Sequence, residues 1–241
     1  MIETFAALLF AHVLADFPLQ TDRMAATKHN PATLARHGAI VSVTAYIALG
    51  RYDTWVPLAL AVAHIVIDIV KINVRPQGLA TFFADQTAHL ATLFATALFF
   101  PGLFAAGIWS AVPALAPLMA LAAGLMAATI AGGHILRVFV ARWEDETINL
   151  PKGLPGGGRL IGLLERGIIF LLVLTNQAAG VGFLIAAKSV LRFDTTRKDH
   201  TAGEYVIIGT LASFGWAMVV SWLTLALLAT MHPLGILPPT P

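Results

Sequence analysis

Long apolar segments recur along the whole sequence of 241 residues, and they restrict the fold more than any other feature. A helix needs about 20 apolar residues to cross a bilayer, and fewer when its ends are anchored. Apolar residues make up 58% of the chain and charged residues 12%, about half the charged share of a soluble domain. The sequence therefore predicts an all-α, polytopic transmembrane helical bundle.

About eight membrane segments are predicted. Lysine and arginine gather in alternate connections, and the positive-inside rule then places both termini on the extracytoplasmic side. The second and seventh segments are short enough to be partial or re-entrant. The eight segments are Ile2–Pro18, Arg36–Gly50, Trp55–Ile72, Asp85–Leu103, Pro113–Val140, Leu160–Thr175, Ala178–Leu191 and Tyr205–Met231.

The chain is predicted to have two halves and a tail. Residues 1–107 form an N-terminal four-helix half that carries a His/Asp cluster. Residues 108–231 form a C-terminal four-helix half with a Gly-rich cytoplasmic loop and a basic/acidic network, and residues 232–241 form a Pro-rich tail. The chain has no cysteine, which excludes thiolate metal sites, and its net charge of +2 is too small to suggest nucleic acid as a partner.

Histidine and aspartate occur four residues apart at three places in the apolar segments. Residues with this spacing lie on the same face of a helix. The pairs are His12/Asp16 in LLFAHVLADF, His64/Asp68 in HIVIDIVK and Asp85/His89 in FFADQTAHL, and His37 lies near the start of the second segment. With the predicted topology, all of these side chains lie near the cytoplasmic ends of their helices, so we expect them to meet at one depth.

A divalent metal ion would pair with these side chains, since polar groups in hydrocarbon face the bundle interior and find partners there. Imidazole nitrogen and carboxylate oxygen suit zinc, manganese or iron, held as one ion or as two. The predicted ligands are His12, Asp16, His64, Asp68, Asp85 and His89, and the predicted catalytic groups are Asp68, Asp85 and His37. A proton or ion pathway and a purely structural polar network are the alternatives.

A second polar set lies in the C-terminal half. The triple glycine of LPGGGRLIGLLER precedes a predicted helix, and the free amides of a helix N-terminus beside an arginine suit a phosphate group. The predicted substrate-binding residues are Gln20, Lys71, Gln86, Arg159, Lys188 and Arg192. The alternative interpretation is structural, with Glu165 in a salt bridge to Lys188 or Arg192.

Several motifs together resemble one family. HVLADFPLQTD, HIVIDIVK and FFADQTAHL, followed by IGLLERGIIFLLVL, FLIAAKSVLRF and GTLASF, resemble the DUF3307 family of bacterial membrane proteins, and the resemblance continues to about residue 215. It implies a location in the bacterial cytoplasmic (inner) membrane but no activity, because the family's function is not established. The positions that match the family pattern are His12, Asp16, Gln20, His64, Asp68, Lys71, Asp85, Gln86 and His89.

The favoured hypothesis is a metal-dependent hydrolase that acts on a phosphate-containing lipid, with a metal-bound water as nucleophile. An ion- or proton-coupled transporter is the first alternative, although a carrier usually has its site near the midplane of the bilayer. The second is a non-catalytic membrane subunit that docks a partner through RWEDETINLPKG. The expected partners are the lipid bilayer and a phosphate-containing substrate, with a protein partner or a second copy of the chain left open.

Overall fold

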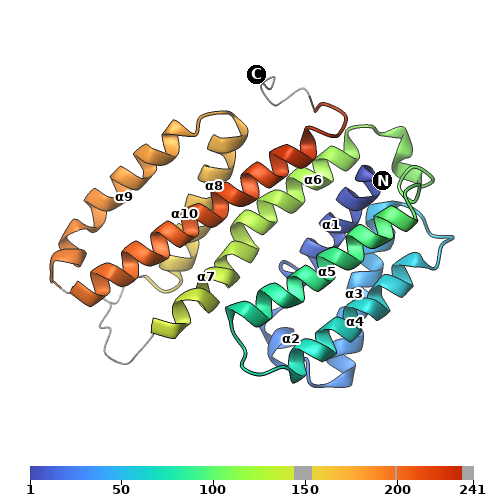
Figure 1. Ribbon diagram of the computed structural model, residues 1–241, viewed down its shortest axis with the longest axis horizontal. Helices are drawn as coiled ribbons and strands as arrows, with labels where there is room; N and C mark the ends of the chain where they lie inside the picture. The colour runs from blue at the N-terminus through green and yellow to red at the C-terminus, as the bar shows by residue number, and fades with distance from the viewer. Residues whose placement is uncertain (144–153, 199, 235–241) are drawn as a thin grey trace. The chain divides into compact units, whose positions relative to one another are not determined.

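The computed structural model describes residues 1–143, 154–198 and 200–234, and every regular element within these ranges is helical (Figure 1). The chain divides into two compact units, which we describe separately. The first comprises Met1–Met126 and Ala226–Leu234, and the second comprises Ala127–Leu225. Most of the predicted docking segment RWEDETINLPKG, residues 144–153, and most of the Pro-rich tail, residues 235–241, lie outside the described residues.

Four helices of the first unit form a closed ring. The unit contains α1 (Ile2–Asp16), α2 (Asp22–Ala26), α3 (Pro31–Leu49), α4 (Val56–Asn73), α5 (Leu79–Phe99), the 3-10 turn η1 (Ile108–Ala111) and α6 (Leu115–Met126). Within it, α1 packs against α3 and α5, and α4 packs against the same two helices. The ring therefore has one interior that all four helices face. The α6 helix also packs against α1.

Small side chains hold α1 and α3 together. The buried core of the unit includes Ala7 and Ala11 from α1 and Ala45 and Ala48 from α3. Small residues let helix backbones approach closely, which is how helices associate where the surrounding lipid is as apolar as the side chains. The small side chains of this core therefore allow α1 and α3 to pack closely.

The start of α3 corrects one sequence prediction. The second segment was expected to begin at Arg36 and to be short, but the helix begins at Pro31 and has 19 residues. The side chain of Asn30 accepts a hydrogen bond from the backbone N–H of Ala32, and proline fits the first helical position because its missing N–H needs no partner there. At the other end, Gly50 adopts a left-handed conformation with φ of 61°, which terminates the helix.

Within the described residues, four helices are long and apolar enough to cross a membrane, so the chain has the character of a membrane protein. They are α3, α4, the helical stretch Leu115–Trp143 and residues Gly203–Leu228. The other predicted segments are also helical, but α1 has only 15 residues and the apolar part of the seventh, Ala179–Val190, is likewise short. The count of eight spans and the orientation of the termini therefore stay predictions.

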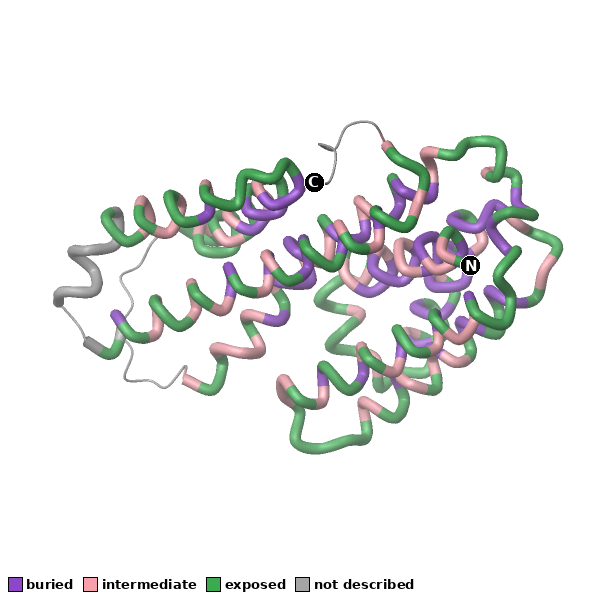
Figure 2. Tube along the Cα trace, turned by 45° about the horizontal axis from the view of Figure 1, so that its top comes forward, coloured by how far each residue is buried: buried purple, intermediate pink, exposed green. Residues whose placement is uncertain are grey.

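The exposed face of α4 is apolar and its buried face carries the polar groups. Figure 2 shows how buried and exposed residues alternate along the helices. Val62, Val66 and Ile69 are exposed, whereas His64 and Asp68 are 4% and 1% exposed. A helix of a soluble protein has the opposite arrangement. This distribution is expected when the solvent around the helix is lipid, because ionisable groups then turn to the bundle interior.

The second unit contains a π-helical turn and four α-helices. Its elements are the π-helical η2 (Ala127–Ala131), α7 (Gly132–Val140), the 3-10 turn η3 (Ala141–Trp143), α8 (Gly157–Leu174), α9 (Ala179–Lys198) and α10 (His200–Leu228), the last of which ends in the first unit. Its core joins α8, α9 and α10 through Ile169, Val173, Val181, Phe214 and Ala217.

Candidate metal centre

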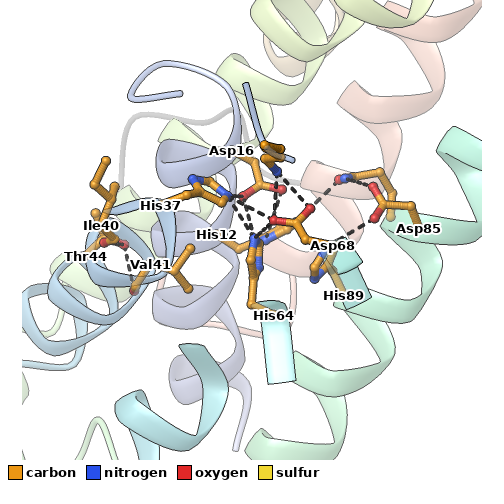
Figure 3. Close-up of polar contacts among 12 residues, drawn as sticks. His12, Asp16, His37, Ile40, Val41, Thr44, His64, Asp68, Asp85 and His89 are labelled. Carbon is orange, nitrogen blue, oxygen red and sulfur yellow. Dashed lines mark hydrogen bonds and ion pairs between the residues drawn. The ribbon is translucent and has the colours of Figure 1, made fainter. Parts of the chain in front are cut away.

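The ring of α1, α3, α4 and α5 encloses a cluster of imidazole and carboxylate groups at one end, which we name the polar pocket (Figure 3). Since the chain reverses between neighbouring helices of the ring, the ends of α1 and α4 lie beside the beginnings of α3 and α5. None of the pocket residues is more than 9% exposed. They are His12, Asp16, His37, His64, Asp68, Asp85 and His89.

Three of these side chains bring one donor atom each to a common point. Nε2 of His37 lies 3.0 Å from Nε2 of His64, and Oδ1 of Asp16 lies 3.3 Å from both nitrogens. A tetrahedral ion with bonds of about 2.0–2.1 Å holds its donor atoms about 3.3 Å apart. The three atoms thus have the separations of three corners of such a coordination shell, and a fourth corner remains for another ligand.

Asp16 is the carboxylate of the polar pocket with the fewest hydrogen-bond and lysine or arginine partners among the described residues. Its Oδ1 is buried and makes no hydrogen bond within the described residues, and no lysine or arginine among them pairs with it. An isolated buried carboxylate is costly, by an amount far larger than an ordinary hydrogen bond contributes. A cation bound between Asp16, His37 and His64 would remove that cost.

Asp68 and Asp85 each have a lysine partner. Nζ of Lys28 donates to both carboxylate oxygens of Asp68 at 2.8 Å, and Nζ of Lys71 donates to Oδ2 of Asp85 at 2.6 Å. Oδ2 of Asp68 also lies 3.5 Å from Nε2 of His64. With neutral imidazoles, three carboxylates and two ammonium groups leave the pocket with an excess of negative charge, which favours a further cation.

A second group of possible metal ligands consists of Asp68, Asp85 and His89, whose nearest ligand atoms lie within 4.8 Å of one another. Oδ1 of Asp85 lies 3.4 Å from Nε2 of His89. Both atoms are buried, and neither makes a hydrogen bond in the part of the chain that is described. The ring of His89 stacks on that of His64, with 4.0 Å between ring centroids, so the two groups are neighbours.

His12 belongs to a third group, with His64 and His89. Its Nδ1 lies 3.9 Å from Oδ2 of Asp16, and its Nε2 lies 3.4 Å from Oε1 of Gln86. Beside these three imidazoles is a small cavity whose other lining residues are mostly apolar, including Leu8 and Leu60. His12 can therefore bind an ion directly or orient Asp16, as residues behind metal ligands commonly do.

The family model described as a protein of unknown function (DUF3307) matches residues 4–135. The chain belongs to the DUF3307 family. The matched span contains the whole polar pocket, whereas the motifs of the C-terminal half lie beyond it. Comparison with curated proteins and with solved structures gives no match.

Sequence reasoning did not include Lys28 in the site of this DUF3307 protein. The residue lies in the connection between α1 and α3, whose path depends on α2, and α2 begins where Thr21 accepts a hydrogen bond from the backbone N–H of Met24. The four-residue spacing of helices cannot predict the position of a side chain in such a connection. The one available signal is the pairing requirement, since buried carboxylates need cations and Lys28 is the only lysine between α1 and α3.

The two predicted glutamines have different surroundings. Nε2 of Gln86 donates to Oδ2 of Asp85 at 3.0 Å, and the same side chain contacts His12, so Gln86 joins two parts of the pocket. Gln20 follows α1, and its Oε1 is buried without a hydrogen bond in the described structure. Their assignment to substrate binding stays a prediction.

In the second unit of the DUF3307 chain, the structural alternative accounts for Lys188. Its Nζ donates to Oε2 of Glu165 at 2.6 Å, which is the salt bridge that the sequence offered as the alternative to phosphate binding. Arg159 is exposed near the start of α8. Arg192 lies on α9, and its side chain is outside the described structure.

Arg166 is buried and serves the helix packing of the second unit. Its Nε and Nη2 donate to the carbonyl of Thr129 in the π-helical turn, at 3.1 and 2.9 Å, and its Nη1 donates to Oγ of Ser213 at 3.2 Å. A Cβ on Gly133 or Gly162 would lie 3.0 Å from the guanidinium, so glycine leaves the space that the arginine fills. This arginine is committed to the backbone rather than free for an anion.

Proposed function

We propose that this protein is a membrane-embedded hydrolase that holds one divalent metal ion between Asp16, His37 and His64 and acts on a phosphate-containing lipid. The observation that supports the ion most directly is the set of donor separations, 3.0 to 3.3 Å, around a buried carboxylate with no lysine or arginine partner among the described residues. Two imidazoles and one carboxylate are a common ligand set of catalytic zinc, which leaves a position for water.

The ion, when bound, would lower the pKa of a water molecule toward neutrality and so supply a nucleophile. Among the residues of the pocket, Asp68 is the carboxylate best placed to take up a proton, because its Oδ2 lies 3.5 and 3.6 Å from the two ligand nitrogens. The sequence suggested His37 as a general base. We assign it instead as a ligand, because its Nε2 is one of the three converging atoms.

The substrate class follows from the surroundings of the pocket. The chain carries helices suited to lipid, so a lipid substrate reaches the pocket without leaving the membrane. The side chains of Lys28 and Lys71 are 11% and 27% exposed, which places ammonium groups between the buried carboxylates and the surface. Ammonium groups attract phosphate. We further propose, from the distribution of basic connections, that this end faces the cytoplasm of the bacterial inner membrane.

Metal content and phosphate release test the proposal together. The purified chain in lipid nanodiscs is expected to contain zinc, manganese or iron by elemental analysis and to release phosphate from an isoprenyl phosphate or from phosphatidate. Asp16→Asn keeps the shape of the side chain but loses its charge, so bound metal and phosphate release should both fall to background.

Asp53→Asn is the matched control, because Asp53 lies in the connection after α3, where it pairs with Arg51, and its side chain is 74% exposed. It should leave both readouts unchanged. A wild-type chain that binds none of these metals after reconstitution would remove the proposal.

Ion- or proton-coupled transport is the second candidate, and one contact favours it. Nε2 of His37 and Nε2 of His64 are 3.0 Å apart, a distance at which two imidazoles can share and pass a proton. A proton flux into proteoliposomes that His37→Ala abolishes, in a preparation that contains no metal, would favour transport over hydrolysis.

A further inference from the structure

We infer that Asp68, Asp85 and His89 form a second divalent-metal site, and that the ion bound there displaces the ammonium groups of Lys28 and Lys71. The inference rests on the proposed function in one respect, because it takes the polar pocket to be a metal centre. It does not depend on the reaction that the centre catalyses.

Two unsatisfied atoms define the second site. Oδ1 of Asp85 and Nε2 of His89 are buried, lie 3.4 Å apart and make no hydrogen bond in the described residues. Their residues are 6% and 2% exposed, so water from the surface does not readily satisfy them. Groups of this kind normally have a partner when buried. When the proton of His89 is on Nδ1, Nε2 and Oδ1 are both lone-pair donors 3.4 Å apart, and a cation bound between them would satisfy both.

Asp68 completes this set. One ligand atom from each of Asp68, Asp85 and His89 lies within 4.8 Å of the others. The set shares no residue with Asp16, His37 and His64, so both sites can be filled at once. It includes Asp68, which therefore takes up a proton in the proposed hydrolase only while the second site is empty. Two carboxylates and one imidazole make a harder set than the first site, which suits manganese, iron or zinc.

Lys28 and Lys71 already bind the carboxylates of Asp68 and Asp85, which are two of the three proposed ligands. Lys28 holds both oxygens of Asp68 at 2.8 Å, and Lys71 holds Oδ2 of Asp85 at 2.6 Å. An ion bound to these carboxylates would lie close to the two ammonium groups. Positive charges that are close together in a buried site repel strongly. The ion and the two lysines therefore compete for Asp68 and Asp85.

If one divalent ion replaces the ammonium groups of both lysines, the repulsion is removed and the net charge of the pocket stays the same. Two ammonium groups carry the same total charge as one divalent ion. Lysine has a long flexible stem, and the side chains of Lys28 and Lys71 are already 11% and 27% exposed, so both can turn toward water while their stems stay on the protein. The two lysines thus keep the carboxylates paired when the second site is empty, and they weaken the second ion relative to the first.

Titration with Zn²⁺ against a chromophoric chelator tests the exchange on the full-length chain in detergent. The chain has no cysteine, so thiolates do not contribute to the signal. The wild type is expected to bind two ions, the second more weakly. Lys28→Met and Lys71→Met should each tighten the second ion about ten-fold or more, and by a larger factor than the first ion, because each removes a cation that competes for a carboxylate of the second site. Asp85→Asn should remove the second ion and keep the first.

Lys188→Met is the matched control, because Lys188 forms an equally short salt bridge, 2.6 Å, with Glu165 in the other unit. It should leave the affinity for both ions unchanged. Because Lys28→Met and Lys71→Met test the same exchange, one of them is enough if the other fails to fold. A single ion in the wild type and in both lysine variants would overturn the second site but leave the proposed function intact. Two ions whose affinities ignore both lysines would overturn the exchange, and no ion at all would overturn the proposed function as well.

Discussion

His64→Ala is expected to reduce the affinity for the first metal ion by more than about 100-fold and to abolish phosphate release. The imidazole supplies one of the three converging donor atoms, 3.0 Å from Nε2 of His37 and 3.3 Å from Oδ1 of Asp16. Loss of a residue that merely orients a ligand already weakens metal binding by about 10–100-fold, and loss of the ligand itself should exceed that range. Elemental analysis and the phosphate assay measure the two effects.

The control for this variant is His232→Ala, because His232 is exposed after α10, where its Nδ1 lies 3.0 Å from the carbonyl oxygen of Pro233. Both proteins should elute as single symmetric peaks with the helix content of the wild type. If His64→Ala bound the first ion as tightly as the wild type, the assignment of the ligands to Asp16, His37 and His64 would be wrong.

Gly107→Ala is expected to lower the stability of the first unit by about 3 kcal/mol or more. A Cβ at this position would lie 2.1 Å from the backbone carbonyl oxygen of Leu49, which cannot move aside as a side chain can. The segment also holds the end of α3 through Ile108, whose N–H donates to the carbonyl of Gly50 at 2.9 Å. Overpacking typically costs about 1–3 kcal/mol, and each lost hydrogen bond adds about 1 kcal/mol. Thermal unfolding in detergent, followed by tryptophan fluorescence, measures the loss.

Gly102→Ala is a matched control in the same connection, because a Cβ there meets nothing within 4 Å. Its unfolding temperature should stay near that of the wild type, since a surface substitution usually changes stability by less than about 0.5 kcal/mol. Equal unfolding temperatures for the two alanine variants would mean that η1 does not pack on the end of α3 as described.

The sequence predicted the helical class and the convergence of the polar pocket for one physical reason. Polar groups in apolar helices turn inward, and a spacing of four residues places His12 with Asp16 and His64 with Asp68 on one face. Alternating helix directions then bring those faces to one end of the ring. The ligand roles of these residues stay predictions, because the same convergence would also arise in a proton pathway.

What the sequence could not predict depends on contacts between segments. The sequence placed His37 in the cluster as a catalytic group, but it did not predict the contact of His37 with Asp16, which lies on another helix. Lys28 reaches Asp68 only because a capped short helix directs the connection. The predicted segment began too late, at Arg36, because it followed the apolar residues, whereas α3 begins at Pro31 after the cap at Asn30. Each of these features is set by polar contacts rather than by apolar periodicity.

The four-helix ring also has a consequence for the order of synthesis. Its imidazole and carboxylate residues lie between residues 12 and 89, so all of them are synthesised before α6 and the helices of the second unit. An ion bound at this stage would tie α1, α3, α4 and α5 together before the second unit is complete. Cells starved of the metal should then accumulate nascent chains whose first helices are accessible to protease.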